Sequence, residues 1–97
     1  MKKAALLVAA LAFSGAASAQ EATRNMAAAC AICHGTDGRA TSNAVTSLAG
    51  LSREKIASEM RAFRDGQRPA TVMHQIAKGY TDQQIDAMAS WFAAQKR

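Results

Sequence analysis

The feature that most constrains the fold is the run Cys30-Ala31-Ile32-Cys33-His34. On a helical turn, residues three apart point the same way, so the sulfurs of Cys30 and Cys33 face one side. Two thiols at this spacing, with a histidine directly after the second, are typical of the covalent attachment of a c-type haem. The sulfurs can form thioethers at one macrocycle edge, and the His34 imidazole can bind iron from the proximal side. The motif therefore predicts one covalently held haem.

Other kinds of site can use the same residues. A redox dithiol of the form Cys-x-x-Cys belongs near a strand–helix unit, and the sequence shows no β-α-β pattern. A zinc site has the right inventory, because His74 adds a second histidine to the two cysteines and His34. It would, however, require the adjacent Cys33 and His34 to ligate one tetrahedral ion. A structural disulfide leaves His34 without a role. Haem attachment is favoured, and the zinc and dithiol sites remain as alternatives.

The N-terminal segment has the organisation of a secretory signal peptide. Lys2 and Lys3 give a positive start, an apolar run covers residues 4–13, and Ala17-Ser18-Ala19 supplies a small-x-small cleavage site. The apolar run is shorter than the roughly 20 residues that a membrane span needs. We therefore predict that residues 1–19 are cleaved, that no membrane span remains, and that the protein is exported to the periplasm.

The remaining chain, residues 20–97, is predicted to be a single domain. Removing 19 of the 97 residues leaves 78. Lys2 and Lys3 are two of the twelve basic residues, so ten basic residues remain against seven acidic ones, a net charge of +3. A charge this mild, without a basic stripe, argues against nucleic-acid binding. A domain of this size is marginally stable on its own, and a covalently held macrocycle would supply the missing core.

The mature chain is predicted to be all-α, with three to four helices wrapped around the haem. Capping signals and apolar periodicity place them over residues 21–32, between Ser52 and Gly66, over residues 70–78, and after Thr81. Residues 35–50 lack periodicity and are predicted to form a loop around the cofactor.

Apolar stripes indicate which helical residues are buried. The second helix carries Ile56, Met60 and Phe63, and the last helix carries Ile85, Met88, Ala89 and Phe92. Thr81 and Gln84 have the spacing of a capping box. On the polar face of the second helix, the spacing also predicts an Arg61–Asp65 ion pair.

The second axial ligand of the iron is predicted to be Met73. Met60 and Met88 lie in apolar stripes and are interpreted as core residues, and Met26 lies one turn before the attachment motif, on its side of the haem. Met73 lies between two helices, 39 residues after His34. His74 is its immediate competitor, and is interpreted as a surface or propionate-side residue. A thioether ligand favours ferrous iron and raises the potential, whereas a second imidazole lowers it.

These residues carry a family resemblance. The attachment motif, the step Leu48-Ala49-Gly50, and Met73 ahead of a capped last helix resemble a small bacterial class I cytochrome c. The runs 61–66 and 73–80 more closely resemble the cytochrome subunit of flavocytochrome c sulfide dehydrogenase. The resemblance implies that Cys30 and Cys33 are thioether attachments, His34 the proximal ligand and Met73 the distal ligand of one haem c.

The sequence departs from that family at two places. Members often carry a proline before Leu48-Ala49-Gly50, whose carbonyl orients the proximal histidine, and residues 43–47 contain no proline. The acceptor for the second nitrogen of His34 is therefore open. The aromatic residue expected on the first helix is replaced by alanines, which leaves its contact with the last helix to Met26 and alanines against Trp91 and Phe92.

The predicted function is that of a periplasmic single-haem electron carrier, and not an enzyme, because no catalytic acid or base is evident. Its partners would be redox proteins, either a sulfide-oxidising flavoprotein or a membrane electron-transfer complex. The alternative is a haem enzyme or gas sensor in which the distal site is open and Met73 is a packing residue. Arg64, Arg68 and Lys78 lack acidic partners at helical spacing and are predicted to form a positive docking rim.

Overall fold

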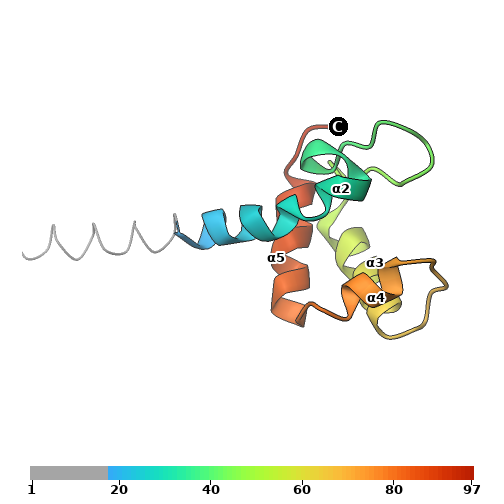
Figure 1. Ribbon diagram of the computed structural model, residues 1–97. Coiled ribbons are helices and arrows are strands. Elements are labelled where there is room, and N and C mark those ends of the chain that lie inside the picture. Colours follow the sequence, from blue (N-terminus) through green and yellow to red (C-terminus); the bar gives the residue numbers. More distant parts are fainter. Residues whose placement is uncertain (1–17) are drawn as a thin grey trace, which may run out of the picture.

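The computed structural model describes residues 18–97, and this part of the chain contains helices and no strand. Figure 1 shows a first helix, over residues 18–28, that projects from the rest of the fold and leads into a cluster of four further helices. These are α2 (Ala31–His34), α3 (Arg53–Arg64), α4 (Met73–Ala77) and α5 (Asp82–Ala93), with one 3-10 turn, η1 (Thr36–Gly38). The all-α prediction is confirmed. The predicted signal peptide lies almost wholly outside the described residues.

Side-chain caps fix where the two long helices begin. The Ser52 hydroxyl accepts a hydrogen bond from the Lys55 amide at 3.1 Å, which starts α3. At α5, the Gln84 amide donates to the Thr81 hydroxyl at 3.1 Å, and the Thr81 amide donates to the Gln84 side chain at 2.9 Å. The predicted capping box is therefore confirmed. Such caps satisfy amides that the first helical turn leaves without an intrahelical partner.

Two helix boundaries differ from the sequence prediction. The helix predicted over residues 21–32 ends at residue 28, and the attachment motif forms the separate turn α2, which begins after Cys30. The amides of Cys33 and His34 both bond to the Cys30 carbonyl, so this turn is closed by its own backbone. The helix predicted over residues 70–78 covers only Met73–Ala77, and no side chain caps its start at Val72.

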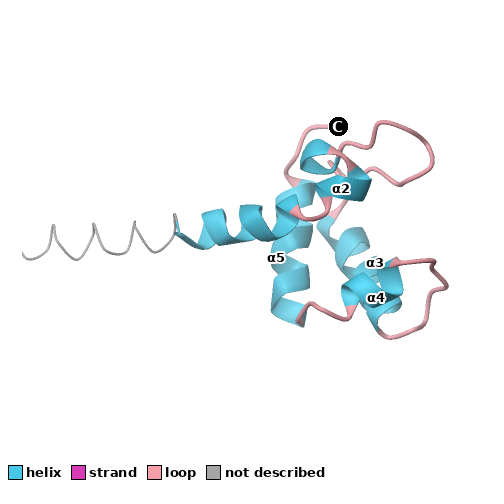
Figure 2. Ribbon diagram, viewed as in Figure 1, coloured by secondary structure: helices cyan, strands magenta, loops and turns pink. Residues whose placement is uncertain are grey.

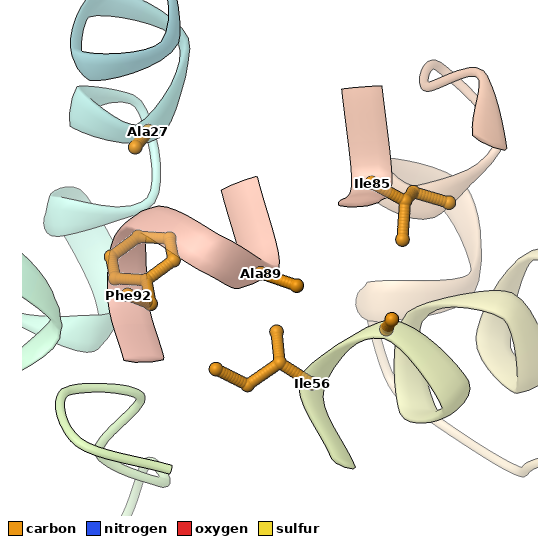
Figure 3. Close-up of a cluster of buried hydrophobic side chains, with 6 residues drawn as sticks. Ala27, Ile56, Ile85, Ala89 and Phe92 are labelled. Atoms are coloured by element: carbon orange, nitrogen blue, oxygen red, sulfur yellow. The ribbon is translucent and has the colours of Figure 1, made fainter. Parts of the chain in front are cut away.

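The core lies where α5 crosses α3 and the end of the first helix, and Figure 3 shows most of its side chains. The predicted buried stripe of α5 is confirmed, and α3 contributes buried Ile56 with half-buried Met60 and Phe63. Among residues 18–97, nine apolar residues are buried, and five of them are alanines. Alanine buries little apolar area, so the polypeptide alone forms a thin core.

Phe92 replaces the missing aromatic contact of the first helix. Its side chain is 2% exposed and packs in the same cluster as Ala27, from the first helix (Figure 3). Trp91 meets the Phe92 ring edge to face, with the centroids 5.1 Å apart, an arrangement that aromatic pairs favour. A small residue on the first helix therefore lets the α5 aromatic approach its backbone.

Candidate haem site

The turn α2 carries Cys33 and His34 of the attachment motif, and Cys30 is the residue at its N-cap. None of the residues from Ala31 to His34 is buried, and Ile32, between the two cysteines, is 89% exposed. Cys33 is exposed and Cys30 is half-buried, and both are free thiols. Burial raises the pKa of the Cys30 thiol, and the neighbouring Cys33 adds to the rise. Two free thiols close together at one exposed turn are the arrangement that thioether formation at a macrocycle edge requires.

The His34 ring is held by a residue that the sequence did not identify. Its Nδ1 lies 2.7 Å from the backbone carbonyl oxygen of Thr46. A carbonyl can only accept, so Nδ1 carries a proton, and Nε2 is the ring nitrogen left to act as a ligand. Thr46 therefore takes the part of the proline carbonyl that the family resemblance leads one to expect. Since the acceptor is backbone, no side-chain pattern pointed to it.

The segment that carries Thr46 is tied to the rest of the fold at its base. The amides of Leu48 and Ala49 both donate to the Gly38 carbonyl, and the Gly50 amide donates to the Phe92 carbonyl at 3.0 Å. Further out, the Ala40 amide donates to the Ser47 hydroxyl at 2.9 Å. These bonds connect the carbonyl of Thr46 to α5, so the orientation of His34 depends on the core.

Two glycines permit the tight path between α2 and this segment. Gly35 has φ +86°, and a Cβ there would lie 1.9 Å from the Arg39 carbonyl oxygen. Gly38 has φ +81°, and a Cβ there would lie 2.8 Å from Phe92 Cδ1. Only glycine adopts such angles readily and lacks the clashing atom. The loop can therefore turn back directly after His34.

Met73 lies on a different element from the attachment motif. It is the first residue of α4, is half-buried, and belongs to a helix that packs on α3, whereas α2 packs on η1. In Figure 2 the loops before α3 and before α4 reach out on the same side of the molecule. The structure thus groups Cys30, Cys33 and His34 on one turn and supplies Met73 from a second, separately anchored segment.

The residues of this region fit a haem c. The donor set consists of two thiols on one turn, an imidazole whose Nδ1 is already bonded, and a thioether, which together match c-type ligation. Large apolar side chains stay accessible on the two candidate segments, with Ile32 at 89%, Val72 at 49% and Ile76 at 40% exposure. Within residues 18–97 no three His, Cys, Asp or Glu side chains gather as a metal site.

The charges around α3 are arranged differently from the sequence prediction. Arg61 pairs with Asp86 at 2.7 Å and with Asp82 at 3.2 Å, and not with Asp65. Arg64 pairs with Asp82 at 2.8 Å and with Asp65 at 3.2 Å. Hydrogen bonds from Arg64 and Arg61 lower the pKa of the Asp82 carboxyl. The predicted Arg61–Asp65 pair is wrong, because α5 brings two acids closer than the same helix does.

The predicted positive rim is also reduced by these pairs. Arg64 has two acidic partners, and Arg68 pairs with Glu59 and stacks over the Phe63 ring, 4.8 Å from its centroid. Of the three rim residues, Lys78 alone has no salt bridge to the described residues. Sequence spacing detects partners on one helix and misses those that a neighbouring helix supplies.

Comparison with known families decides the assignment. A family model described as "Cytochrome C oxidase, cbb3-type, subunit III" matches residues 17–92. The chain belongs to this cytochrome c family. The fold and the electron-transfer class expected from the attachment motif are therefore confirmed, and a haem of the c type is the cofactor that the family supports.

Curated relatives of this cytochrome act in electron transfer. It is 44% identical over 63 residues to the cytochrome subunit of sulfide dehydrogenase of Chlorobaculum tepidum, covering 65% of this chain and 56% of the relative. It is 36% identical over 70 residues to cytochrome c-554(548) of Halomonas halodenitrificans, covering 69% of this chain and 84% of that relative. It is 37% identical over 70 residues to a thiosulfate dehydrogenase electron acceptor of Thiomonas intermedia, covering 69% of this chain and 32% of that relative.

These relatives are named as cytochromes or electron acceptors, in agreement with the electron-transfer class of the family. The predicted resemblance to the sulfide dehydrogenase subunit is confirmed. The matched segment spans little more than half of that relative and about a third of the thiosulfate dehydrogenase acceptor. Among residues 18–97, no helix combines the length and the apolarity needed to cross a membrane.

Proposed function

We propose that this cytochrome carries single electrons by means of one haem c, bound covalently by Cys30 and Cys33 and ligated by His34 and Met73. The observation that carries the proposal is the His34–Thr46 hydrogen bond, because it orients the imidazole beside the two thiols and leaves Nε2 as the possible ligand atom. When bound, the haem would supply an iron that cycles between its ferrous and ferric states.

Each residue of the chain has a separate task in this proposal. Cys30 and Cys33 hold the macrocycle on α2, so it cannot dissociate between encounters. The Thr46 carbonyl orients His34 and increases its basicity, as outer partners of metal-bound imidazoles do. Met73 supplies a soft neutral sulfur that favours the ferrous state and raises the potential. Unchanged ligands in both states would keep the reorganisation on electron transfer small.

The partner class in this proposal is a redox protein that oxidises a sulfur compound. The names of two relatives, a sulfide dehydrogenase subunit and a thiosulfate dehydrogenase acceptor, support it. A flavoprotein that oxidises sulfide would do the chemistry, and this cytochrome would accept electrons singly and pass them to a membrane complex. Export to the periplasm, with cleavage before Gln20, belongs to the same proposal and is supported by the signal-peptide pattern.

The second candidate is a haem enzyme or gas sensor with an open distal position. It requires Met73 to be a packing residue, as Met60 is. The packing of α4 on α3 is compatible with this second candidate. The two functions differ in whether a small ligand can reach the iron. A methionine-bound ferric haem has a weak absorption band near the red edge of the visible spectrum, and an open site lacks it.

Two measurements on the exported protein test the proposal. Mass spectrometry should find residues 20–97 plus one haem that resists acid–acetone extraction. The ferric spectrum should contain the methionine band, and the ferrous protein should not bind carbon monoxide. Haem that washes out would overturn covalent attachment. A missing band together with rapid carbon monoxide binding would replace the carrier with the sensor or enzyme.

A further inference from the structure

The guanidinium of Arg39 joins two segments that are far apart in the chain. Its Nη1 donates to the backbone carbonyl of Lys96 at 2.8 Å, and its Nη2 donates to a carboxylate oxygen of Asp37 at 3.1 Å. Figure 1 shows the end of the chain at the same end of the molecule as α2. A guanidinium presents several donors in one plane, so a single side chain can hold two acceptors at once. Arg39 therefore ties the loop after η1 to the C-terminal segment.

The backbone of Arg39 lies against the end of the attachment turn. A Cβ built on Gly35, the residue directly after His34, would lie 1.9 Å from the Arg39 carbonyl oxygen. The Arg39 amide donates to the carbonyl of Thr36 at 3.0 Å. A displacement of Arg39 would therefore move the backbone next to the proposed proximal ligand.

The backbone on either side of Arg39 holds the segment that follows Thr46. The carbonyl before Arg39 accepts hydrogen bonds from the two amides of residues 48–49, and the amide after it donates to the Ser47 hydroxyl at 2.9 Å. Thr46 itself supplies the carbonyl to which His34 Nδ1 donates. Arg39 thus lies where the attachment turn and the segment that orients His34 meet.

The C-terminal segment that receives the Arg39 side chain is itself anchored to α5. The Gln95 amide donates to the Phe92 carbonyl at 3.1 Å, and the Gln95 side chain donates to the Trp91 carbonyl at 2.8 Å. The Arg97 side chain packs on Gly50, where a built Cβ would lie 2.7 Å from Arg97 Cγ. The acceptor of the Arg39 bond is therefore held by several contacts of its own.

We infer that Arg39 is a positioning residue for the proximal ligand, because its bond to Lys96 keeps the Thr46 carbonyl in place for His34. This inference deepens the proposed function and rests on it. The bond from His34 to Thr46 increases the basicity of the imidazole, and a more basic ligand favours ferric iron. Loss of the Arg39 contacts weakens that bond, so the potential rises.

The sign of the change separates a positioning role from an effect of charge. A positive charge near the iron favours the ferrous state, so removal of the Arg39 charge alone would lower the potential. This effect is small, because Arg39 is exposed and paired with Asp37. We expect Arg39→Met to shift the ferrous-to-ferric ratio at a fixed applied potential about twofold toward ferrous. Exchange of the His34 Nδ1 proton should become about threefold faster.

The experiment compares four holoprotein variants. Arg39→Met removes the guanidinium, and Arg39→Lys keeps the charge and one donor group. Arg53→Met is the control for loss of an exposed arginine, since Arg53 has no salt bridge to the described residues. Ser52→Ala removes the cap of α3 and is the control for a general loss of stability.

Voltammetry measures the potential, and nuclear magnetic resonance of the ferrous protein labelled with ¹⁵N-histidine measures exchange of the His34 Nδ1 proton. The expected result is a raised potential and faster exchange in Arg39→Met, a smaller change of the same sign in Arg39→Lys, and neither change in the controls. A potential that is unchanged or lowered in Arg39→Met, or an unchanged exchange rate, overturns the inference. An equal rise in potential in Ser52→Ala also overturns it, because the cause is then general loosening.

If Arg39→Met fails to accumulate, Arg39→Lys decides the question by the same two measurements. Because this variant keeps the charge, a potential and an exchange rate equal to those of the wild type overturn the inference. Failure of the proposed function looks different, because the wild-type protein would then contain no covalent haem or would lack the methionine band.

Discussion

The imidazole of His34 donates to the backbone carbonyl of Thr46, 2.7 Å away and twelve residues later in the chain. The bond joins the attachment turn to a loop that is itself tied to α5 through Gly38 and Phe92. The His34–Thr46 bond therefore restrains the proposed proximal ligand relative to the core. The acceptor of this bond is a backbone carbonyl, and not a side chain of the loop. This relationship leads to the first prediction.

We expect Thr46→Ala to leave the potential and the spectrum of the holoprotein unchanged, because the acceptor is the backbone carbonyl. Ser47→Ala removes the hydroxyl that accepts from the Ala40 amide, and should lower the free energy of unfolding by about 1 kcal/mol. Voltammetry and urea unfolding of both variants measure these effects. A shifted potential in Thr46→Ala would mean that its side chain, and not its carbonyl, supports His34.

We expect Met73→Ala to retain covalent haem but to bind carbon monoxide or imidazole and to have a lower potential, because the thioether is lost. His34→Ala should prevent a stable holoprotein. Met88→Leu is the matched control, since Met88 is 3% exposed in the core and the exchange conserves its volume. Spectra and ligand titrations of the three variants give the answer. If Met73→Ala binds no added ligand and keeps its spectrum, the distal assignment is wrong.

We expect Gly38→Ala to destabilise the protein by more than 2 kcal/mol, because the new Cβ would lie 2.8 Å from Phe92 Cδ1 in addition to the strain of φ +81°. Gly66→Ala is the control, since Gly66 has φ +75° with nothing within 4 Å of a built Cβ. It should lose only about 1–2 kcal/mol. Denaturant unfolding measures both. Equal losses would show that the Phe92 contact adjusts freely.

The pH dependence of stability should contain a contribution from Asp82. Its pKa is lowered in the folded state by Arg64 and Arg61, so its stabilising effect is fully present above the unfolded value of 3.8. The effect is lost as the pH falls through the lower folded-state pKa.

We expect Asp82→Asn to be less stable than the wild type at neutral pH, with the difference shrinking below pH 3.8. Glu21→Gln, an exposed change of the same charge, should show no such convergence. Thermal unfolding over a pH series measures this. A gap between Asp82→Asn and the wild type that is constant with pH would exclude the arginine pairs as its cause.

Electron transfer from a flavoprotein should depend only weakly on salt, because Arg64 and Arg68 are paired with acids of the same molecule. Lys78→Gln should alter the salt dependence of the second-order rate more than Arg68→Gln does, since Lys78 is exposed and lacks a pair within the described residues. Stopped-flow measurement of the second-order reduction rate across a salt series compares the two variants. If the rate instead depends steeply on salt concentration and Arg68→Gln abolishes that dependence, the predicted positive docking rim would be supported.

The fold class and the attachment motif could be predicted from the sequence, whereas the break between the first helix and α2 could not. Thiols three apart followed by His34 have one common chemical use, and the caps at Ser52 and Thr81 depend only on residues within one helical turn. Such local signals need no knowledge of the rest of the chain. The apolar stripe of α5 was equally visible, because burial follows the helical period.

The tertiary structure alone decided which distant groups meet. The Thr46 carbonyl carries no sequence signal as an acceptor, because every residue has one. The partners of Arg61, Arg64 and Arg68 depend on how α3 packs on α5 and on the loop beyond α3. Short-range spacing covers contacts within one helix, whereas the orientation of His34 and the charge of the docking surface arise between elements brought together by the burial of apolar surface.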